Sequence, residues 1–252
     1  MEDELVKWFA GQSRVALAFS GGVDSAYLLH AAHVAGADVR AYYVVSAFQP
    51  EFEREDARKM AKECGVELVE IPLDVLADER IASNPADRCY WCKRAVFGAI
   101  LEAAECDGFP LVIDGTNASD DASDRPGMRA LRELGVRSPL RECGLTKQRI
   151  RELSREAGLF TWDKPSYSCL ATRIPRGEPL TSEALAATER AENFLRERGF
   201  SDFRVRRIGD CARIQLPRDQ WDKLLEEHET VRAALADDYA DVLLDLKERK
   251  SE

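Results

Sequence analysis

The sequence predicts an α/β protein in which a parallel sheet carries helices on both faces. Short apolar runs alternate with amphipathic stretches over the longer N-terminal part of the chain, which is the order of βαβ units. A glycine pair separates the first apolar run from the first helical stretch, as in a tight strand-to-helix turn. From residue 180 the order becomes a helix, two strand-like runs and a helix, which predicts a smaller C-terminal α+β domain.

Hydrophobic spacing places the elements of the larger domain. Strands are expected over residues 15–20, 39–46, 66–71 and 110–114, and helices over residues 23–35, 51–64, 92–104 and 146–157. Gly65 is expected to end the second helix, and Thr146 to cap the start of the last. Because such sheets bind ligands at the carboxyl ends of their strands, the side chains that follow each strand are the candidates for chemistry.

The remaining segments predict loops and a second domain. Residues 114–126 are rich in Asp, Ser and Asn, and residues 160–178 contain prolines, so both are expected to be loops. A helix over 182–198, strands over 203–208 and 212–216, a helix over 217–235 and a strand-like or helical tail follow. We place the domain boundary near residue 175, which divides the chain into residues 1–175 and 176–252.

Composition and charge limit the class of protein. The chain of 252 residues is 45% hydrophobic and 33% charged, which predicts a globular protein with a full core. Its net charge of -10 disfavours nucleic-acid binding, because that binding depends on Lys and Arg that displace counterions. We see no run long enough to span a membrane and no signal peptide, so we expect a cytoplasmic protein. Seven cysteines in such a reducing compartment indicate metal or redox chemistry rather than disulfides.

The hexapeptide between the first strand and the first helix has the chemistry of a phosphate loop. It reads Ser20-Gly21-Gly22-Val23-Asp24-Ser25. Glycines let the backbone approach an anion, and the N–H groups at a helix N-terminus attract it. Serine hydroxyls can donate to phosphate oxygens, and Asp24 can hold a Mg2+ that bridges phosphates. A plain strand-to-helix turn also uses glycines, but the full hexapeptide is more specific, and it lacks the Gly-Lys-Ser/Thr ending of a Walker A loop.

Three cysteines have surroundings that favour the thiolate. Cys89 and Cys92 form a CxxC at the opening of a predicted helix, and Cys169 lies in a predicted loop among cationic residues. Cations and helix N-termini lower a thiol pKa. The pair could be accidental or a redox disulfide, while three thiolates with one open iron suit a 4Fe–4S cluster. The remaining cysteines are expected to be buried or half-buried hydrophobes: Cys64, Cys106, Cys143 and Cys211.

The hexapeptide matches every fixed position of the SGGxDS motif, and residues 14–126 resemble the PP-loop ATP pyrophosphatase superfamily, which has the adenine nucleotide alpha hydrolase-like fold. These enzymes split ATP between the α and β phosphates, adenylate a substrate oxygen and release pyrophosphate. The resemblance implies ATP and Mg2+ as cofactors. Further nucleotide contacts are expected at strand ends, at Ser46, Asp114, Thr116 and Asn117. The carboxylates that follow are either a magnesium site or a solvated loop: Asp120, Asp121 and Asp124.

Four stretches narrow the resemblance. They are RCYWCK (88–93), DGTNASDDASDRPG (114–127), KPSYSCLATRIPRG (164–177) and RVRRIGDCARI (204–214). They look like the LarE family of sulfur transferases, over nearly the whole chain, and the third stretch is the most specific. This family makes the pincer nickel nucleotide of lactate racemase. It adenylates a carboxylate of pyridinium-3,5-biscarboxylic acid mononucleotide and turns that carboxylate into a thiocarboxylate.

The resemblance implies two ways to supply sulfur. A cysteine in the position of Cys169 attacks the adenylate and displaces AMP. In single-cysteine members this residue gives up its own sulfur and becomes dehydroalanine. In three-cysteine members, whose pattern this chain has, Cys89, Cys92 and Cys169 would hold a 4Fe–4S cluster that carries sulfide.

The resemblance also implies roles around that cysteine. Arg204 and Arg206 alternate along a strand, so both face one side and can grip a phosphate or carboxylate, unless that face is simply solvated. Glu192 is implied near the active cysteine. Arg173 and Trp91 are implied at the substrate, although a core aromatic would look the same as Trp91. One departure is Gln215, which stands where single-cysteine members carry an acidic residue, so their metal site is in doubt here.

Partners and rival functions follow from the same resemblance. The family forms hexamers built as trimers of dimers, acts on a small-molecule nucleotide and hands over to other proteins of the nickel-pincer pathway. The smaller domain would then serve substrate binding, sulfur transfer and oligomerisation. Three alternative hypotheses for the function are a tRNA-thiolating PP-loop enzyme, an amide-forming synthetase, and a non-catalytic nucleotide-binding or iron–sulfur scaffold. The synthetase would need no cysteine.

Overall fold

The computed structural model describes residues 3–12, 14–120 and 126–249. The chain forms two compact units, each described by itself. The first comprises Met1–Val75 and Asp87–Lys164, and the second comprises Leu76–Ala86 and Pro165–Glu252. By contacts, the linker from Pro165 onward and a short segment before the CxxC both belong with the C-terminal part. The division of roles at residue 175 stays a prediction.

The first unit is built on a four-stranded parallel sheet. Its strands are β1 (Arg14–Ala18), β2 (Asp38–Val45), β3 (Leu68–Pro72) and β4 (Leu111–Asp114). They lie in the order β3-β2-β1-β4, and Arg14 pairs with Asp38 while Val15 pairs with Leu111. The predicted α/β class with a parallel sheet is therefore confirmed.

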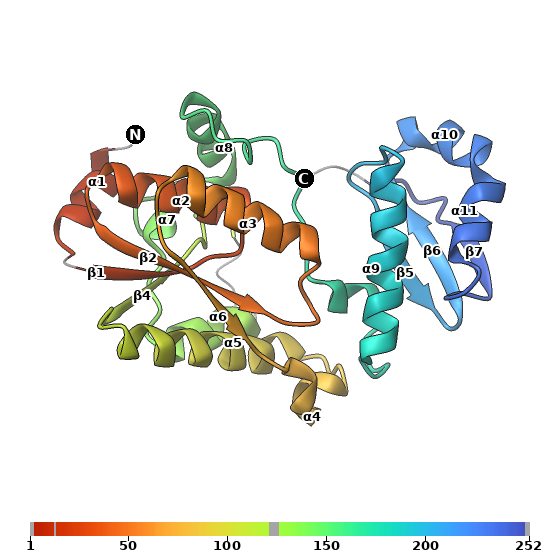
Figure 1. Ribbon diagram of the computed structural model, residues 1–252, viewed down its shortest axis with the longest axis horizontal. Coiled ribbons are helices and arrows are strands. Elements are labelled where there is room, and N and C mark those ends of the chain that lie inside the picture. The colour runs from red at the N-terminus through yellow and green to blue at the C-terminus, as the bar shows by residue number, and fades with distance from the viewer. Residues whose placement is uncertain (1–2, 13, 121–125, 250–252) are drawn as a thin grey trace. The chain divides into compact units, whose positions relative to one another are not determined.

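Helices cover both faces of this sheet (Figure 1). One layer contains α1 (Asp3–Ala10), α2 (Val23–Val34), α3 (Glu51–Glu63), α7 (Pro139–Glu142) and α8 (Lys147–Glu156). The other contains α5 (Arg88–Cys106) and α6 (Pro126–Glu133). Successive strand residues serve opposite layers, since Val15 and Leu17 pack in the first core and Ala16 packs in the second. This alternation buries both faces, as a parallel sheet requires.

The second unit is a small α+β domain. Helix α9 (Ser182–Glu197) packs on a sheet of β5 (Arg204–Ile208), β6 (Cys211–Gln215) and β7 (Asp241–Leu244). Strands β5 and β6 are antiparallel, and β7 is parallel to β6. The helix expected over 217–235 is divided into a 3-10 turn η3 (Arg218–Gln220), α10 (Trp221–Glu226) and α11 (His228–Leu235). The tail contains a strand, one of the two forms expected for it.

Several short elements were not expected. They are the 3-10 turns η1 (Val75–Ala77) and η2 (Leu170–Arg173), with the helices α1, α4 (Glu79–Ala82), α6 and α7. Each has too few turns to show a hydrophobic period, and α6 opens on Pro126 and Gly127, which are typical of loops. Helix α5 begins at Arg88, four residues before the expected start, so both CxxC cysteines lie within its first turns. No helix among the described residues is long and apolar enough to cross a bilayer.

Candidate functional site

The phosphate loop joins β1 to α2 in the conformation that its glycines permit. Gly21 has φ +74, and a Cβ there would lie 3.0 Å from the Glu53 carbonyl oxygen and 3.2 Å from the Ala57 nitrogen. Only glycine fits both the backbone angle and the contact. Gly22 is the N-cap of α2, and no side chain caps the first N–H groups of the helix. Such groups can bind an anion.

Hydroxyl groups brace the loop from inside. Ser25 is 3% exposed, and its Oγ donates to the Gly22 carbonyl at 3.1 Å and lies 3.1 Å from Ser20 Oγ. The Ser20 backbone N–H also donates to Ser25 Oγ at 3.3 Å. Ser20 itself is exposed. Ser25 therefore holds the loop in shape, and Ser20 is the hydroxyl that a phosphate can reach.

Asp24 has an oxygen whose hydrogen-bonding capacity is unused. Its Oδ2 accepts from Lys147 Nζ at 2.6 Å, whereas its buried Oδ1 has no hydrogen-bond partner among the described residues. Burial raises the pKa of Asp24, and the Lys147 ammonium opposes that shift. A carboxylate oxygen with no partner, beside a phosphate loop, is a hard ligand that fits Mg2+. Asp24 would hold the ion, and Lys147 would then be available to the phosphates.

The segment after β4 packs directly against the phosphate loop. A Cβ on Gly115 would lie 2.9 Å from the Ser25 nitrogen. Asp114 accepts hydrogen bonds from Thr116 Oγ1 and Ser138 Oγ, both at 2.6 Å, and Asn117 Oδ1 accepts the Ser119 N–H at 2.8 Å. Asp114 and Asn117 are buried, so in this structure they shape the segment. The predicted nucleotide contacts are thus brought to the loop.

The other predicted strand-end residues have the following places. Ser46 follows β2 at the same sheet edge and donates to Gln49 Oε1 at 2.6 Å. Val23 is buried in the core, so it can offer a ligand only its backbone. Asp120 is exposed and accepts the Asn117 N–H at 2.8 Å. Asp121 and Asp124 lie outside the described residues.

We predict that Gly115→Ala weakens the nucleotide site. The added methyl group would meet the Ser25 backbone at 2.9 Å, so the phosphate loop must shift. Overpacking of this kind costs about 1–3 kcal/mol. We expect a lower melting temperature and a raised KM for ATP. The matched control is Gly98→Ala on α5, where nothing lies within 4 Å of the new Cβ, and which should leave both values unchanged or raise the stability slightly.

The end of the first unit is fastened to the phosphate loop. Lys164 Nζ lies 3.1 Å from Glu53 Oε1, 2.7 Å from Asp56 Oδ2 and 3.5 Å from the Gly21 carbonyl oxygen. Arg151 on α8 donates to the Trp162 and Lys164 carbonyls at 2.8 and 2.9 Å. Lys164 is the last residue before the segment that carries Cys169. The sequence did not predict the contacts of Lys147, Arg151 and Lys164, because each contact joins residues that are not neighbours in the chain.

The CxxC lies in the first turns of α5. Cys89 is exposed and Cys92 is half-buried, and their spacing of three residues puts both thiols on one side of the helix. Arg88 Nη2 lies 4.0 Å from Cys89 Sγ. Trp91 is half-buried, donates through Nε1 to Asp87 Oδ2 at 3.1 Å and packs edge-on against Tyr90. The pair supplies two soft ligands of the kind that iron–sulfur clusters use.

Cys169 lies in the second unit, at the start of η2. Its carbonyl accepts hydrogen bonds from Thr172 N at 3.0 Å and Thr172 Oγ1 at 2.8 Å, and its side chain is half-buried. Arg173 Nη1 donates to Ser168 Oγ at 2.9 Å and to Thr172 Oγ1 at 2.7 Å. One arginine therefore binds the side chains of Ser168 and Thr172, which lie on either side of Cys169 in the chain. No group of three or more His, Cys, Asp and Glu side chains in the described parts of the chain is close enough to hold a metal.

A buried ion pair supports this arginine. Arg173 Nε donates to Glu192 Oε1 at 2.6 Å, and the two side chains are 0% and 1% exposed. Glu192 also accepts from Tyr167 OH at 2.6 Å and from the Val205 N–H at 2.9 Å. Burial, and then the Glu192 charge, raise the pKa of Tyr167. Arg173 and Glu192, expected at the substrate and the reacting groups, lie beneath the Cys169 segment and fix its shape.

The two arginines of β5 reach the same segment. Arg204 donates to the Ser166 carbonyl, and Arg206 Nη1 donates to the Thr172 carbonyl at 2.6 Å. Arg204 is 5% exposed, which rules out a solvated face at that position. Burial, followed by the nearby Arg173, lowers the pKa of Arg204 to about 10 and also lowers that of Arg206. The interior around Cys169 thus carries an excess of positive charge, which an anionic substrate would offset.

The other four cysteines are not among the predicted site residues. Cys64 is buried, Cys143 and Cys211 are half-buried as expected, but Cys106 is exposed because it falls on the outer side of the last turn of α5. Burial raises the pKa of Cys64 to about 11, so it is unreactive.

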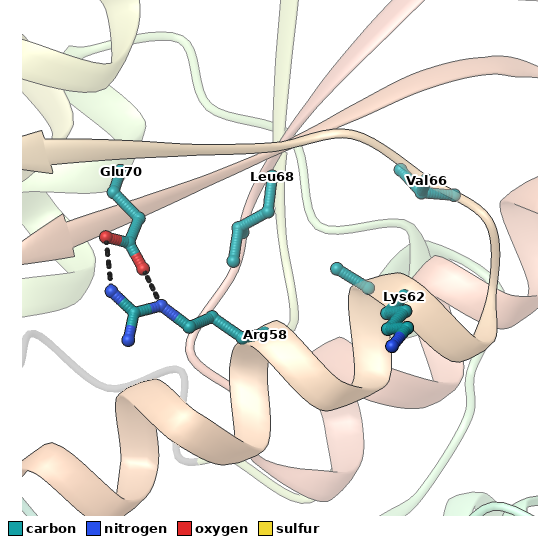
Figure 2. A pocket seen from close by; sticks show the side chains of 6 residues that line it. Arg58, Lys62, Val66, Leu68 and Glu70 are labelled. Carbon is teal, nitrogen blue, oxygen red and sulfur yellow. Dashed lines mark hydrogen bonds and ion pairs between the residues drawn. The ribbon is translucent and has the colours of Figure 1, made fainter.

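Figure 2 shows a pocket of about 440 Å³ between α3 and β3. It is lined by Arg58, Ala61, Lys62, Val66, Leu68 and Glu70. Hydrogen bonds from Arg54 and then Arg58 lower the pKa of Glu70 to about 2, so the ion pairs there are already satisfied. The pocket includes the start of β3, at the sheet edge away from the phosphate loop, and contains none of the predicted site residues. It is therefore not the candidate site.

The sequence is similar to those of several known proteins. No protein-family model matches the chain. It is 37% identical over 206 residues to pyridinium-3,5-bisthiocarboxylic acid mononucleotide synthase of Lactiplantibacillus plantarum, covering 81% of this chain and 75% of that protein. It is 36% identical over 226 residues to an uncharacterized protein of Synechocystis, covering 89% and 84%. A tRNA-specific 2-thiouridylase of Frankia alni is 31% identical over 189 residues, covering 60% and 53%.

The match to the synthase covers 81% of the chain, which is more than either compact unit alone contains, so it extends over both. The match to the thiouridylase covers a smaller share of each chain. The chain belongs to the LarE family of PP-loop enzymes, which are ATP-dependent sulfur transferases.

Proposed function

We propose that this enzyme adenylates a carboxylate of pyridinium-3,5-biscarboxylic acid mononucleotide and converts it to a thiocarboxylate. The name of the Lactiplantibacillus relative supplies the product. The observation that carries the proposal is the place of the three cysteines. The chain passes from one unit to the other at residues 75–76, 86–87 and 164–165. Cys89 follows the second crossing by three residues and Cys169 follows the third by five.

Covalent geometry limits how far Cys169 can stray from the nucleotide. Lys164 contacts the phosphate loop through the Gly21 carbonyl, and Cys169 lies five positions further along the chain. A fully extended chain of that length spans at most about 18 Å. The thiol is therefore tethered near a residue of the ATP site, whatever the arrangement of the two units. This supports a common site for adenylation and sulfur transfer.

The adenylation step uses residues of the first unit. A carboxylate oxygen of the substrate attacks the α-phosphorus, the bond to the β-phosphate breaks, and pyrophosphate leaves. The N–H groups of the loop and Ser20 would hold the phosphates, with Lys147 adding a positive charge. Asp24 would hold Mg2+, which offsets charge on the phosphate oxygens when bound. The product is a mixed anhydride whose carbonyl carbon can be attacked, because AMP is a good leaving group.

The transfer step uses the second unit together with Trp91 of the first unit. A sulfur nucleophile attacks that carbonyl carbon, and the bond to the AMP oxygen breaks. Arg204 and Arg206 would bind anionic groups of the substrate, and Trp91 would stack on the pyridinium ring. Arg173 and Glu192 are positioning residues, since Arg173 binds the carbonyl and hydroxyl of Ser168 and Glu192 pairs with Arg173. Cys169 would either donate its own sulfur or act as one of three cluster ligands.

We place a 4Fe–4S cluster on Cys89, Cys92 and Cys169. The two thiols on α5 fit two corners of such a cluster, and the crossings bring the third cysteine within a few residues of the same boundary. When bound, the cluster would supply sulfide and leave the protein's cysteines intact. The sacrificial use of Cys169 is the alternative, and the two differ in the mass of the protein after turnover.

A decisive experiment offers the purified enzyme ATP, Mg2+ and either the mononucleotide or tRNA. We expect pyrophosphate release that depends on the mononucleotide, and a product mass in which sulfur replaces oxygen. Pyrophosphate release with tRNA alone would favour the tRNA-thiolating alternative. ATP binding without any pyrophosphate release would favour a scaffold. We further propose a cytoplasmic hexamer, built as a trimer of dimers, that serves lactate racemase cofactor synthesis with other proteins of that pathway.

A further inference from the structure

Two arginines stand directly opposite each other on the second sheet. In the antiparallel pair of β5 and β6, Arg206 is the register partner of Arg213. Val205, Ala212 and Ile214 point into the core of the unit, so both guanidiniums extend from the other face. Like charges at directly opposed positions destabilise a sheet. A pair of this kind needs a counter-charge.

The protein holds Arg206 in place with neutral groups. Its Nε donates to Gln215 Oε1 and its Nη1 to the Thr172 carbonyl, both at 2.6 Å. Within the described chain, Arg206 has no carboxylate at ion-pair distance. The amide Nε2 of Gln215 donates to Asp245 Oδ2 at 2.6 Å. The Asp245 carboxylate is therefore linked to Arg206 only through the Gln215 side chain. The guanidinium is thereby oriented but not neutralised.

Arg213 also has unused capacity. Its Nε lies 3.5 Å from Asp245 Oδ2, which is beyond a good hydrogen bond. The Nε atom is buried and has no hydrogen-bond partner among the residues described. Its side chain is 36% exposed. Burial and then the charges of Arg173, Arg213 and Arg249 lower the pKa of Arg206, which agrees with a local excess of positive charge. An oxyanion between Arg206 and Arg213 would relieve it.

We infer that Arg213 and Arg206 form an anion subsite, which binds a carboxylate or phosphate of the mononucleotide other than the carboxylate being adenylated. This inference rests on the proposed function. The substrate carries two carboxylates and a phosphate, so two anionic groups remain to be held while the third reacts. Gln215 is the positioning residue of the subsite, because its neutral amide keeps Arg206 available to the ligand.

Binding of three ligands to Arg213→Gln tests the subsite. The ligands are the mononucleotide, its nucleoside without the phosphate, and nicotinate mononucleotide, which lacks one carboxylate. The matched control is Arg207→Gln, which removes the same charge from the next residue of β5, where the side chain pairs with Asp210. We expect Arg213→Gln to weaken mononucleotide binding about tenfold, and Arg207→Gln to change it less than about twofold. Arg213→Lys should fall between them.

The ligand that loses its sensitivity to Arg213 identifies the bound group. If it is the phosphate, the nucleoside binds equally to both proteins; if it is a carboxylate, nicotinate mononucleotide does. Equal weakening by Arg213→Gln and Arg207→Gln, or no weakening by either, would overturn the inference and leave the proposed function standing. Failure of the unaltered enzyme to bind the mononucleotide would overturn the proposed function and the inference with it.

A second variant tests Gln215. Gln215→Glu keeps the shape but places a carboxylate on Arg206, so mononucleotide binding should weaken at pH 7. Binding should recover as the pH falls through the pKa of the new carboxyl, because its protonation restores a neutral partner. We expect ATP binding to be unchanged in Gln215→Glu. A purely structural defect would weaken ATP binding as well, and mononucleotide binding would not recover as the pH falls.

Discussion

Cys169→Ser should abolish sulfur transfer while the enzyme still releases pyrophosphate from ATP. Serine keeps the size of the side chain but carries no sulfur to donate and makes a poor ligand for iron, so both routes to the product fail. We expect thiocarboxylate formation to fall by about 10³-fold or more. Adenylation depends on residues of the first unit, among them Lys147 and Asp24, and should persist. The measurement is product by mass spectrometry beside pyrophosphate release.

The control is Cys106→Ser. Cys106 is exposed at the end of α5, so its replacement should change neither activity. Equal loss of transfer in both variants would point to general damage by oxidation rather than to a role of Cys169. Transfer that survives in Cys169→Ser would contradict the account outright. In the unaltered enzyme, an unchanged protein mass after turnover would exclude the sacrifice of Cys169.

Glu192→Ala should produce the largest loss of stability. It would leave Arg173, whose side chain is 0% exposed, with no carboxylate partner in its buried contacts. It would also remove the acceptor of Tyr167 OH and of the Val205 N–H. Breaking a buried pair on one side costs about 3–5 kcal/mol. Because the chain has two units, the suitable measurement is hydrogen exchange of β5 and β6 amides, which reports the opening of the second unit.

The same helix provides a matched control. Arg190 on α9 pairs with Asp238, but the arginine side chain is 60% exposed. Removing it by Arg190→Ala should cost about 0–1 kcal/mol, as for other exposed pairs. Similar protection loss in the two variants would mean that Glu192 contributes no more than a surface charge. Such a result would remove the argument that Arg173 and Glu192 hold the Cys169 segment.

Local features of the molecule could be predicted from the sequence. The phosphate loop follows from six consecutive residues, and Thr146 caps α8 as expected, accepting the Arg149 N–H at 3.3 Å. The parallel sheet follows from the alternation of strands and helices. In each case the residues that decide the structure are neighbours in the chain, or repeat with a period that the sequence displays.

Contacts between distant residues could not be predicted. Lys147 reaches Asp24, and Gln215 bridges Arg206 to Asp245, because the fold brings their elements together; no spacing in the sequence records it. Arg173 was expected at the substrate because it lies near Cys169 in the sequence. Nothing in that position predicted its buried ion pair with Glu192. Glycine at position 115 gave a weak signal, since it follows a strand, but its contact with Ser25 depends on the packing of two loops.

We propose that thiols from two separate segments serve one site beside the nucleotide. Iron content after anaerobic reconstitution with iron and sulfide tests it most directly. We predict about four irons per chain, lost alike in Cys92→Ser and Cys169→Ser and kept in Cys106→Ser. Full iron content in Cys169→Ser, with loss only in Cys92→Ser, would show that the CxxC works apart from Cys169 and would contradict the shared centre.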